Sequence, residues 1–479
     1  MKPSGTFRAE SDPLGNVAVP AEALWGGQTQ RAVEDFPVSG QTIPRPIIRA
    51  LALIKRAAAE TNQAQGALPT ELAQAIVQAA DEIAAGRHDD QFPVDVFQTG
   101  SGTSTHMNVN EVIANRAIQL LGGEIGSKRP VHPNDHVNLG QSSNDVFPSA
   151  VHVAAADSAT RDLLPGLRTL QTALTRKAAA LADVIKIGRT HLQDAVPIRL
   201  GQELSGYATM VGNGARRIEQ ALPAIHELAL GGTAVGTGFG ARPEFAQAVV
   251  ERLRAQTNLP FVQAPDLCEA LGARDALVAL SAAVRGAAIS VTKIANDIRW
   301  LASGPRCGLG ELKLPSLQAG SSLMPGKVNP VMAEMLVMVA AQVVGNDATV
   351  AWAGAGGTLE LNAMIPVIGF NVLRSIEILA NGCRLFANRC VDGIEANEER
   401  CRELVERSLS LATALLPRLG YDRAAAVAYE AAAQGKTIRE ICLEQKLVDP
   451  DELDRLLDPR DMTRAGLPPG QDVRATAKG

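Results

Sequence analysis

The chain has 479 residues, of which 46% are hydrophobic, 20% are charged and 3% are aromatic, and its formal net charge is -5 at pH 7. The high apolar fraction argues against long disordered segments, and the absence of a Lys/Arg run argues against nucleic acid as a partner. Ala and Leu, which are strong helix formers, are prominent, whereas β-branched and aromatic runs are scarce. The composition therefore predicts a mainly α-helical globular protein.

The N-terminal residues Met1–Gly15 contain no apolar segment of the kind found in signal peptides, and the acidic residues Glu10 and Asp12 argue against a transit peptide. One of the longest apolar stretches, between Glu334 and Asp347, is shorter than the roughly 20 residues of a membrane-spanning helix. We therefore expect a cytoplasmic protein with no membrane partner.

Helical patterns and breaks rich in Gly and Pro divide the sequence into three predicted domains. Residues 1–139 alternate helical patches, such as Ile47–Gln65, with a polar stretch at Gln98–Asn110 that we interpret as a loop. Residues 140–394 form a predicted bundle of long helices, and residues 395–479 a small C-terminal helical domain.

The helix predicted around Leu277 has the clearest periodicity in the chain. Its apolar residues recur at spacings of three and four, at Leu277, Leu280, Val284, Ala287, Val291, Ile294, Ile298 and Leu301. Its other faces carry apolar residues such as Val278 and Ile289, so the helix must be buried on several sides. Because a single bundle would not cover it, we expect several chains to share a helical core, and closed symmetry favours a homotetramer.

The sharpest motif is GSSLMPGKVNP at Gly320–Pro330, which places hydroxyls, a cation and an amide on a loop before an apolar helical stretch. Such a loop can fold over an anion. A Walker phosphate loop does not fit, because five residues separate the glycines and Val328 follows Lys327 where Ser or Thr is required. A plain surface turn remains an alternative on composition alone, since Gly, Pro and Asn are ordinary turn formers.

This loop resembles the GSSxMPxKxNP signature of the fumarase/aspartase superfamily at every fixed position. Other segments resemble the class II fumarases of that superfamily, in order along the chain: Gln98–Thr103 with Met107–Glu111, Val131–Asp135, Gln141–Asp145, Gly188–Asp194, Gly231–Gly238 and Asn296–Trp300. The resemblance implies a mainly α, three-region fold in which a central long-helix bundle forms the helical core of a tetramer.

The resemblance also implies a reaction, the reversible trans hydration of fumarate to L-malate through a carbanion, a step of the tricarboxylic acid cycle. It implies Ser321 as the base, His191 as the group acting at the other carbon, and Glu334 as the partner that fixes the His191 tautomer. The residues implied to bind substrate are Ser101, Thr103, Ser142, Ser143, Asn144, Thr190, Lys327 and Asn329. A second dicarboxylate site is implied at His132, Asn134 and Asp135. In this family three subunits contribute to each active site.

Several of these residues also have purely structural interpretations. The cluster Ser142–Asn144 could cap a helix, a role that is compatible with binding a carboxylate. His191 could be a buried histidine bonded to a backbone carbonyl. His132 could shape a turn, and Glu334 is favourably placed near a helix N-terminus.

Aspartate ammonia-lyase, which shares the fold and the signature loop, remains an alternative function. The forms of Gln98–Thr103, Gly188–His191 and Leu359–Asn362 favour a fumarase, whereas Ser104–His106 and Ala363–Ile365 depart from the commoner patterns. A catalytically silent helical scaffold is an alternative of another class. No metal or redox cofactor is expected, because the histidines lack ligand spacing and the six cysteines contain no CxxC pair.

Overall fold

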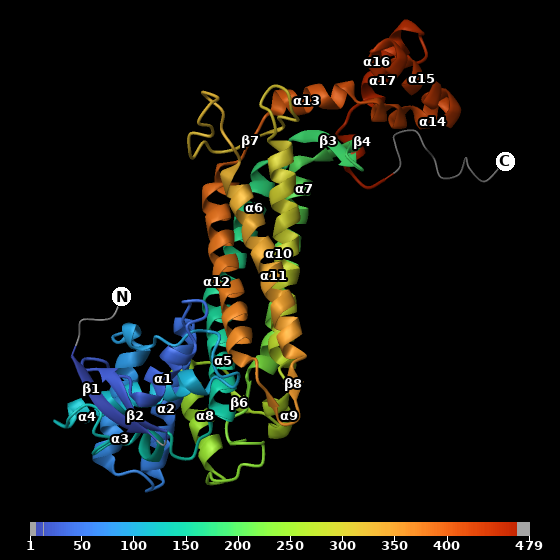
Figure 1. The fold of residues 1–479 in the computed structure, drawn as a ribbon. Coiled ribbons are helices and arrows are strands. Elements are labelled where there is room, and N and C mark those ends of the chain that lie inside the picture. Colours follow the sequence, from blue (N-terminus) through green and yellow to red (C-terminus); the bar gives the residue numbers. More distant parts are fainter. Residues whose placement is uncertain (1–5, 13, 467–479) are drawn as a thin grey trace. The chain divides into compact units, whose positions relative to one another are not determined.

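The computed structural model describes residues 6–12 and 14–466 (Figure 1). They form two compact units, and each unit is built from three separate segments of the chain. Unit 1 comprises the chain up to Gly166 together with Gly214–Ile289 and Val339–Asn381. Unit 2 comprises Leu167–Asn213, Ser290–Met338 and the chain from Gly382 onward.

The division into three domains remains a prediction, since the grouping into two units follows contacts between distant segments rather than sequence order. Residues 1–5 and 13 of the N-terminal segment, and residues 467–479 of the predicted C-terminal domain, lie outside the described residues.

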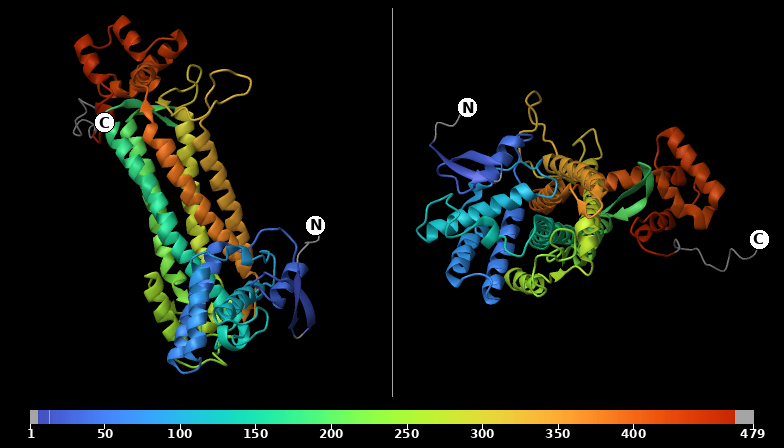
Figure 2. Two further views of the ribbon diagram at one scale, coloured as in Figure 1. Left: turned by 90° about the vertical axis from the view of Figure 1, so that its left-hand side faces the viewer. Right: turned by 60° about the horizontal axis from the view of Figure 1, so that its bottom comes forward.

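Unit 1 begins with an antiparallel hairpin followed by a cluster of helices. These elements are β1 (Phe7–Asp12), β2 (Gly15–Pro20), α1 (Gly27–Asp35), α2 (Arg45–Ala64), α3 (Thr70–Ala84), α4 (Thr103–Leu120) and α5 (Ser143–Ser158). The unit also contains α8 (Phe245–Thr257), α9 (Leu267–Gly272), the parallel pair β5 (Glu227–Leu228) and β6 (Val262–Gln263), and the antiparallel pair β8 (Gly357–Thr358) and β9 (Leu361–Asn362). Helix α2 packs against α3, α5 and α8, and α4 packs against α3 (Figures 1 and 2).

Five long helices contribute segments to both units. They are α6 (Leu164–Ala180), α7 (Leu200–Ile225), α10 (Asp275–Leu301), α11 (Val331–Gly354) and α12 (Ile365–Arg389). The periodic residues predicted from Leu277 to Leu301 are all buried on α10, which confirms that stripe as a core seam. Ile289, on another face of α10, is 56% exposed within the single chain.

Helices α10 and α11 are long and apolar enough to cross a membrane by length and composition alone, with mean hydropathies of 1.5 and 1.3 over 18 residues. The prediction that the apolar stretches are too short was therefore wrong. The stretch between Glu334 and Asp347 is only part of a helix of 24 residues. Core helices of soluble proteins have the same properties, so these two helices are weak evidence for a membrane.

Unit 2 contains the antiparallel hairpin of β3 (Ile185–Thr190) and β4 (Gln193–Arg199) and a group of short helices near the C-terminus. These helices are α13 (Glu398–Arg407), α14 (Leu416–Leu419), α15 (Tyr421–Gln434), α16 (Ile438–Glu444) and α17 (Pro450–Leu456). Strand β7 (Leu312–Lys313) pairs with β10 (Glu395–Ala396). The hairpin shares a hydrophobic core with the short helices, since Ile187 is buried in one cluster with Leu411, Ile441 and Leu453.

The polar stretch Gln98–Asn110 is only partly the loop that its composition predicts, because α4 begins at Thr103. The prediction failed because the polar side chains of Thr105, His106 and Asn108 are turned inward and buried. A helix that buries polar groups does not show the usual alternation of apolar and polar faces.

Candidate active site

The loop before α4 carries Ser101, leads into Thr103 at the first position of the helix, and lies against neighbouring backbone. A Cβ at Gly100 would lie 1.8 Å from the carbonyl oxygen of Ala363, so only glycine fits there. The hydroxyl oxygens of Ser101 and Thr103 are 2.7 Å apart. Gly102, with φ of 75°, directs the chain into the first turn of α4.

The N-terminus of α5 carries the second group of predicted substrate ligands. The Ser142 hydroxyl accepts a hydrogen bond from the Asn144 amide at 3.2 Å, and the Ser142 amide donates to the Asp145 carboxylate at 3.1 Å, which forms a capping box. The capping interpretation is thus confirmed for Ser142. The Asn144 side-chain amide donates to the carbonyl of Ala234 at 2.9 Å.

Helices α4 and α5 begin side by side. The imidazole of His106, in the first turns of α4, lies 2.7 Å from the hydroxyl of Ser143, the first residue of α5. A Cβ at Gly102 would collide with the ring of Phe147 on α5. Two helix N-termini and several hydroxyls therefore face the same region, and the positive ends of the helices and the hydroxyls attract carboxylates.

Asp145 connects this region to the glycine-rich segment after α7. Its carboxylate is buried and accepts hydrogen bonds from the backbone amides of Gly231 at 3.0 Å and Thr233 at 3.1 Å. Burial raises the pKa of Asp145 to about 6, against the opposing effect of these hydrogen bonds. The residue fixes the path of the segment that accepts the Asn144 hydrogen bond.

His132 forms a turn, as its structural interpretation predicts. Its Nδ1 accepts hydrogen bonds from the backbone amides of Asn134 at 3.2 Å and Asp135 at 3.1 Å. The side chains of Asn134 and Asp135 are exposed. Because Nδ1 is an acceptor, the ring carries its hydrogen on Nε2 when it is neutral.

His191 lies at the tip of the β3–β4 hairpin in unit 2. Thr190 pairs with Gln193, and the two turn residues His191 and Leu192 have φ values of 55° and 60°. Two positive φ angles are typical of a type I′ turn, in which Asn and Gly are the usual residues. The His191 side chain is exposed, so the buried-histidine interpretation is wrong. Such backbone strain clusters at functional sites.

The base of this hairpin is held by buried charges. The guanidinium of Arg189 donates two hydrogen bonds to Glu311, at 2.9 and 3.1 Å, and the Lys186 ammonium lies 3.5 Å from the same carboxylate. Glu311 and Lys186 are both buried. The exposed tip that carries His191 is therefore attached to a fixed base.

The signature loop, also in unit 2, closes on itself. The Gly320 amide donates to the Lys327 carbonyl at 2.9 Å, and the Asn329 side-chain amide donates to the Gly320 carbonyl at 2.6 Å. The Ser321 hydroxyl oxygen accepts hydrogen bonds from the amides of Leu323 at 3.2 Å and Met324 at 2.8 Å. The Lys327 side chain is exposed.

Glu334 lies in the first turn of α11, as the sequence predicts. Among the described residues of unit 2, no hydrogen bond or ion pair joins Glu334 to His191. Their proposed pairing therefore remains a prediction.

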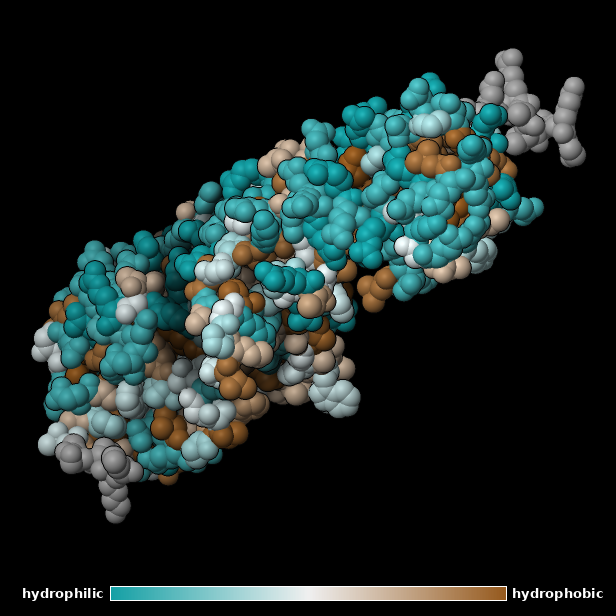
Figure 3. Space-filling view, turned by 90° about the horizontal axis from the view of Figure 1, so that it is seen from above, coloured by the Kyte–Doolittle hydropathy of each residue, from teal (hydrophilic) through white to brown (hydrophobic). Residues whose placement is uncertain are grey.

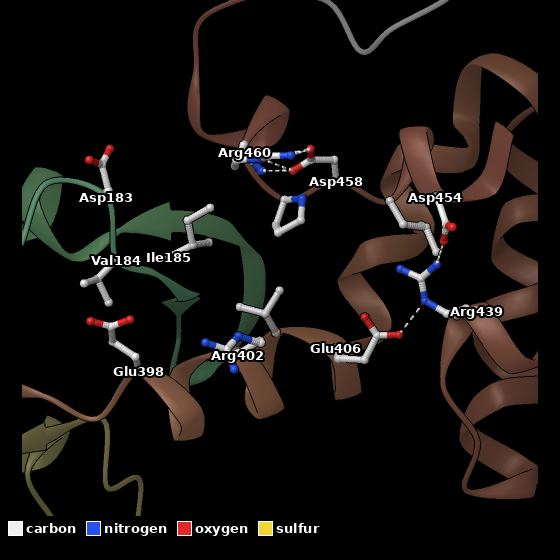
Figure 4. Close-up of a pocket in the computed structure, with 13 residues that line it drawn as sticks. Asp183, Val184, Ile185, Glu398, Arg402, Glu406, Arg439, Asp454, Asp458 and Arg460 are labelled. Carbon is white, nitrogen blue, oxygen red and sulfur yellow. Dashed lines mark hydrogen bonds and ion pairs between the residues drawn. The ribbon is translucent and has the colours of Figure 1, made fainter. Parts of the chain in front are cut away.

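The cavity drawn in Figure 4 lies elsewhere in unit 2 and contains none of the predicted site residues. It has a volume of about 470 Å³ between the β3 hairpin, α13 and the C-terminal helices. Its charged side chains are largely paired, as Arg439 is with Glu406 at 2.9 Å and Arg460 with Asp458. It is not a candidate for the active site.

Three residues beside the candidate site are absent from the predicted set: Lys55, His106 and Asp145. The position of Lys55 on the same face of α2 as Ile48 and Leu51 was a usable signal, because a lysine within an apolar stripe must find partners. His106 lies in a segment that departs from the family pattern. Nothing in the sequence indicates the backbone partners of Asp145.

Comparisons with known proteins agree with the resemblance. Residues 15–345 match the family described as "Lyase", and residues 411–464 match "Fumarase C C-terminus". The chain is 52% identical to "Fumarate hydratase class II" of Neisseria meningitidis, over 95% of this chain and 98% of the relative. It is also 52% identical to "Fumarate hydratase, mitochondrial" of Mus musculus, over 96% and 91%.

Among solved structures, the recombinant class II fumarase from Schistosoma mansoni superposes with a TM-score of 0.92 at 42% identity, over 95% of this chain and 99% of that one. The predicted family and mainly α fold are confirmed. The chain belongs to the class II fumarate hydratases of the lyase family.

Proposed function

We propose that this chain catalyses the reversible trans addition of water to fumarate, which gives L-malate, in the tricarboxylic acid cycle. The observation that carries the proposal is the pair of neighbouring N-termini at α4 and α5, which present hydroxyls and positive helix ends to a carboxylate. Ser101 and Thr103 serve at the start of α4, and Ser142, Ser143 and Asn144 at the start of α5.

In the dehydration direction, the Ser321 alkoxide removes the proton from the carbon next to one carboxylate of malate. The electron pair spreads onto that carboxylate. The backbone amides of Leu323 and Met324, which donate to the Ser321 oxygen, support this role because they stabilise negative charge there. Lys327 and Asn329 stabilise the developing dianion, and donors of this kind contribute about 10²–10³ in rate each.

At the other carbon, the His191 imidazolium gives its proton to the departing hydroxyl, and water leaves. Thr190 binds substrate beside it, and Glu334 pairs with His191 and fixes its tautomer. The exposed position of His191 on a strained turn supports a role outside the core.

We propose a homotetramer in which three subunits build each site. The support is a set of large apolar side chains exposed on α10 and α11 within the single chain, namely Ile289, Trp300, Met338, Val344 and Trp352. Brown apolar patches also interrupt the polar surface of the face drawn in Figure 3. Apolar surface of this extent marks association sites.

The chain belongs to a family of soluble enzymes, and we propose a cytoplasmic location. We also propose a second dicarboxylate site at His132, Asn134 and Asp135. Its support is the hydrogen that His132 carries on Nε2, which is not used by the turn.

One assay separates the candidate functions: the ultraviolet absorbance of fumarate is followed with L-malate, L-aspartate or neither added. A rise with L-malate alone is expected. A rise with L-aspartate alone would identify an aspartate ammonia-lyase, and no change with either would identify a silent scaffold.

The Ser321→Ala variant tests the proposed base. We expect it to lose at least about 10³ in kcat, because no other group would take the proton. Val328→Ala, in the same exposed loop, is the matched control and should keep the wild-type rate.

A further inference from the structure

We propose that Lys55 and His106 are positioning residues that turn Ser143 into an obligatory hydrogen-bond donor toward the substrate carboxylate. The identity of the ligand rests on the proposed function, whereas the contacts between the side chains do not depend on it. It concerns a buried chain of side chains behind the N-termini of α4 and α5.

The ammonium of Lys55 is the inner end of this chain. Lys55 is fully buried, and its Nζ lies 2.6 Å from His106 Nε2, 2.9 Å from Asn138 Oδ1 and 3.0 Å from Gln141 Oε1. The amide nitrogens of Asn138 and Gln141 donate to backbone carbonyls, which leaves their oxygens as the acceptors. Three acceptors therefore converge on a group with three hydrogens.

The charge state of Lys55 is set by opposing effects. Burial lowers its pKa well below the ordinary value, whereas the negative charge of Asp145 raises it. The three short contacts stabilise the ammonium further, since hydrogen bonds to a charged donor are the stronger kind. We therefore assign the protonated form.

The protonated state of Lys55 decides which atom donates and which accepts in each of the following hydrogen bonds. An ammonium can only donate, so His106 Nε2 must accept and the hydrogen of the neutral ring must lie on Nδ1. Burial and the Lys55 charge both lower the pKa of His106, which keeps the ring neutral. Its Nδ1–H then donates to the Ser143 oxygen at 2.7 Å. The Ser143 hydrogen is then not donated to His106 and remains available to another acceptor.

This arrangement keeps the hydrogen of Ser143 available for a carboxylate. A free serine hydroxyl rotates and can offer either a hydrogen or a lone pair. One of the two lone pairs of the Ser143 oxygen accepts from His106, and the protonated Nδ1 cannot accept in return, so the Ser143 hydrogen is not used by the ring before substrate binds. Preorganisation of this kind removes part of the ordering cost of binding.

The tautomer of His106 gives a test that does not depend on activity. We expect histidine-selective ¹⁵N solid-state NMR of the full-length protein to show hydrogen on Nδ1, with the assignment made by loss of the signal in His106→Asn. Hydrogen on Nε2 would overturn the proposal, because Ser143 would then donate to the ring. A wild-type enzyme that turns over neither L-malate nor L-aspartate would contradict the proposed function and leave this result standing.

The KM values of His106 and Ser143 variants test whether this arrangement contributes to substrate binding. His106→Asn keeps the polarity, since an amide can accept from Lys55 and donate to Ser143, and its KM for fumarate should stay within about threefold of wild type. His106→Leu should raise KM by about 10–100-fold, which corresponds to one hydrogen bond to a charged group. In a Ser143→Ala background the same change should have little further effect.

A structural role would give a different pattern. If His106→Leu lowered the melting temperature and affected KM equally with or without the Ser143 hydroxyl, the residue would only fill space, and the proposal would be wrong. Equal KM values for the Asn and Leu variants would contradict it in the same way.

Discussion

Arg189 and Glu311 form a two-point ion pair, with nitrogen–oxygen distances of 2.9 and 3.1 Å, two residues before the exposed His191. The Glu311 side chain is fully buried, and Lys186 approaches it from within the same unit. This carboxylate thus contacts two cations at the base of the hairpin, and Lys186 also lies 3.4 Å from the Glu203 carboxylate. Removing the Glu311 charge would leave Arg189 without its carboxylate partner and the buried Lys186 with Glu203 alone.

We expect Glu311→Gln to destabilise the protein by about 3–5 kcal/mol, because breaking a buried pair leaves an uncompensated charge. Its kcat should also fall, since the hairpin base holds His191. Thermal unfolding and L-malate turnover measure the two effects. Asp183→Asn is the matched control, because Asp183, just before the hairpin, pairs at the surface with Arg199 of β4 and should contribute less than about 1 kcal/mol. Equal melting temperatures for the two variants would contradict the prediction.

The side chain of Glu111 on α4 caps the N-terminus of α1. Its carboxylate accepts from the amides of Gly26 at 2.9 Å and Gln28 at 2.9 Å, and from the Thr29 amide and hydroxyl at 3.1 and 2.5 Å. We expect Glu111→Ala to destabilise the protein by about 2–4 kcal/mol, since several buried donors lose their acceptor. Chemical denaturation measures this, and Glu34→Gln on the exposed face of α1 should be neutral. A neutral Glu111→Ala would show that water replaces the carboxylate.

Glu82 gives a prediction about acid stability. Hydrogen bonds from Arg116, at 2.6 and 3.1 Å, and from His88 lower the pKa of Glu82 from 4.5 to about 2. A depressed folded-state pKa contributes stability above pH 4.5 that is lost as the pH falls toward 2.

The shift corresponds to about 3–4 kcal/mol at most, at about 1.4 kcal/mol per pKa unit. Wild type should therefore exceed Glu82→Gln in stability at pH 6, and the difference should shrink between pH 4.5 and pH 3. Melting temperatures across this range check the sign. A difference that grows as the pH falls would contradict the assignment.

Because Gly100 lies close to Ala363, we expect the addition of one methyl group at Gly100 to lower the activity strongly. Gly100→Ala places a Cβ 1.8 Å from a backbone oxygen, so the loop that carries Ser101 must move. Because a displacement of about 1 Å can lower a rate by about 10²-fold, we expect a loss of that size in kcat/KM.

Gly66→Ala is the control for backbone strain alone. Gly66 has φ of 70° and nothing within 4 Å of an added Cβ, so this variant should lose only about 1–2 kcal/mol of stability and keep its rate. Equal kcat/KM values for the two variants would show that the contact at Gly100 has no role in the site.

Periodicity predicted the parts of the fold in which apolar residues face a core. The stripe from Leu277 to Leu301 is buried on α10 because its spacing matches one face of a helix. The cap at Ser142 was predictable for a similar reason, since the capping box lies within four consecutive residues. Both signals are local in the sequence.

The features that sequence reasoning missed depend on distant contacts. His106 contacts Lys55 across 51 residues, and Glu111 caps a helix more than 80 residues earlier. The composition of the first turns of α4 predicts a loop, because their polar side chains face inward and contact such distant partners. The turn at His191 was also not predictable, because nothing in the residue types His and Leu indicates two positive φ angles.

Each unit is built from three separate chain segments, and this affects how the protein folds during synthesis. Unit 1 lacks Val339–Asn381 until most of the polypeptide has left the ribosome, and unit 2 lacks everything from Gly382 onward until later still. Neither unit can complete its core cotranslationally at an early stage, so nascent chains expose the apolar stripes of α10 and α11 to solvent and to chaperones. A premature stop before Val339 would leave both units incomplete rather than yield one intact domain.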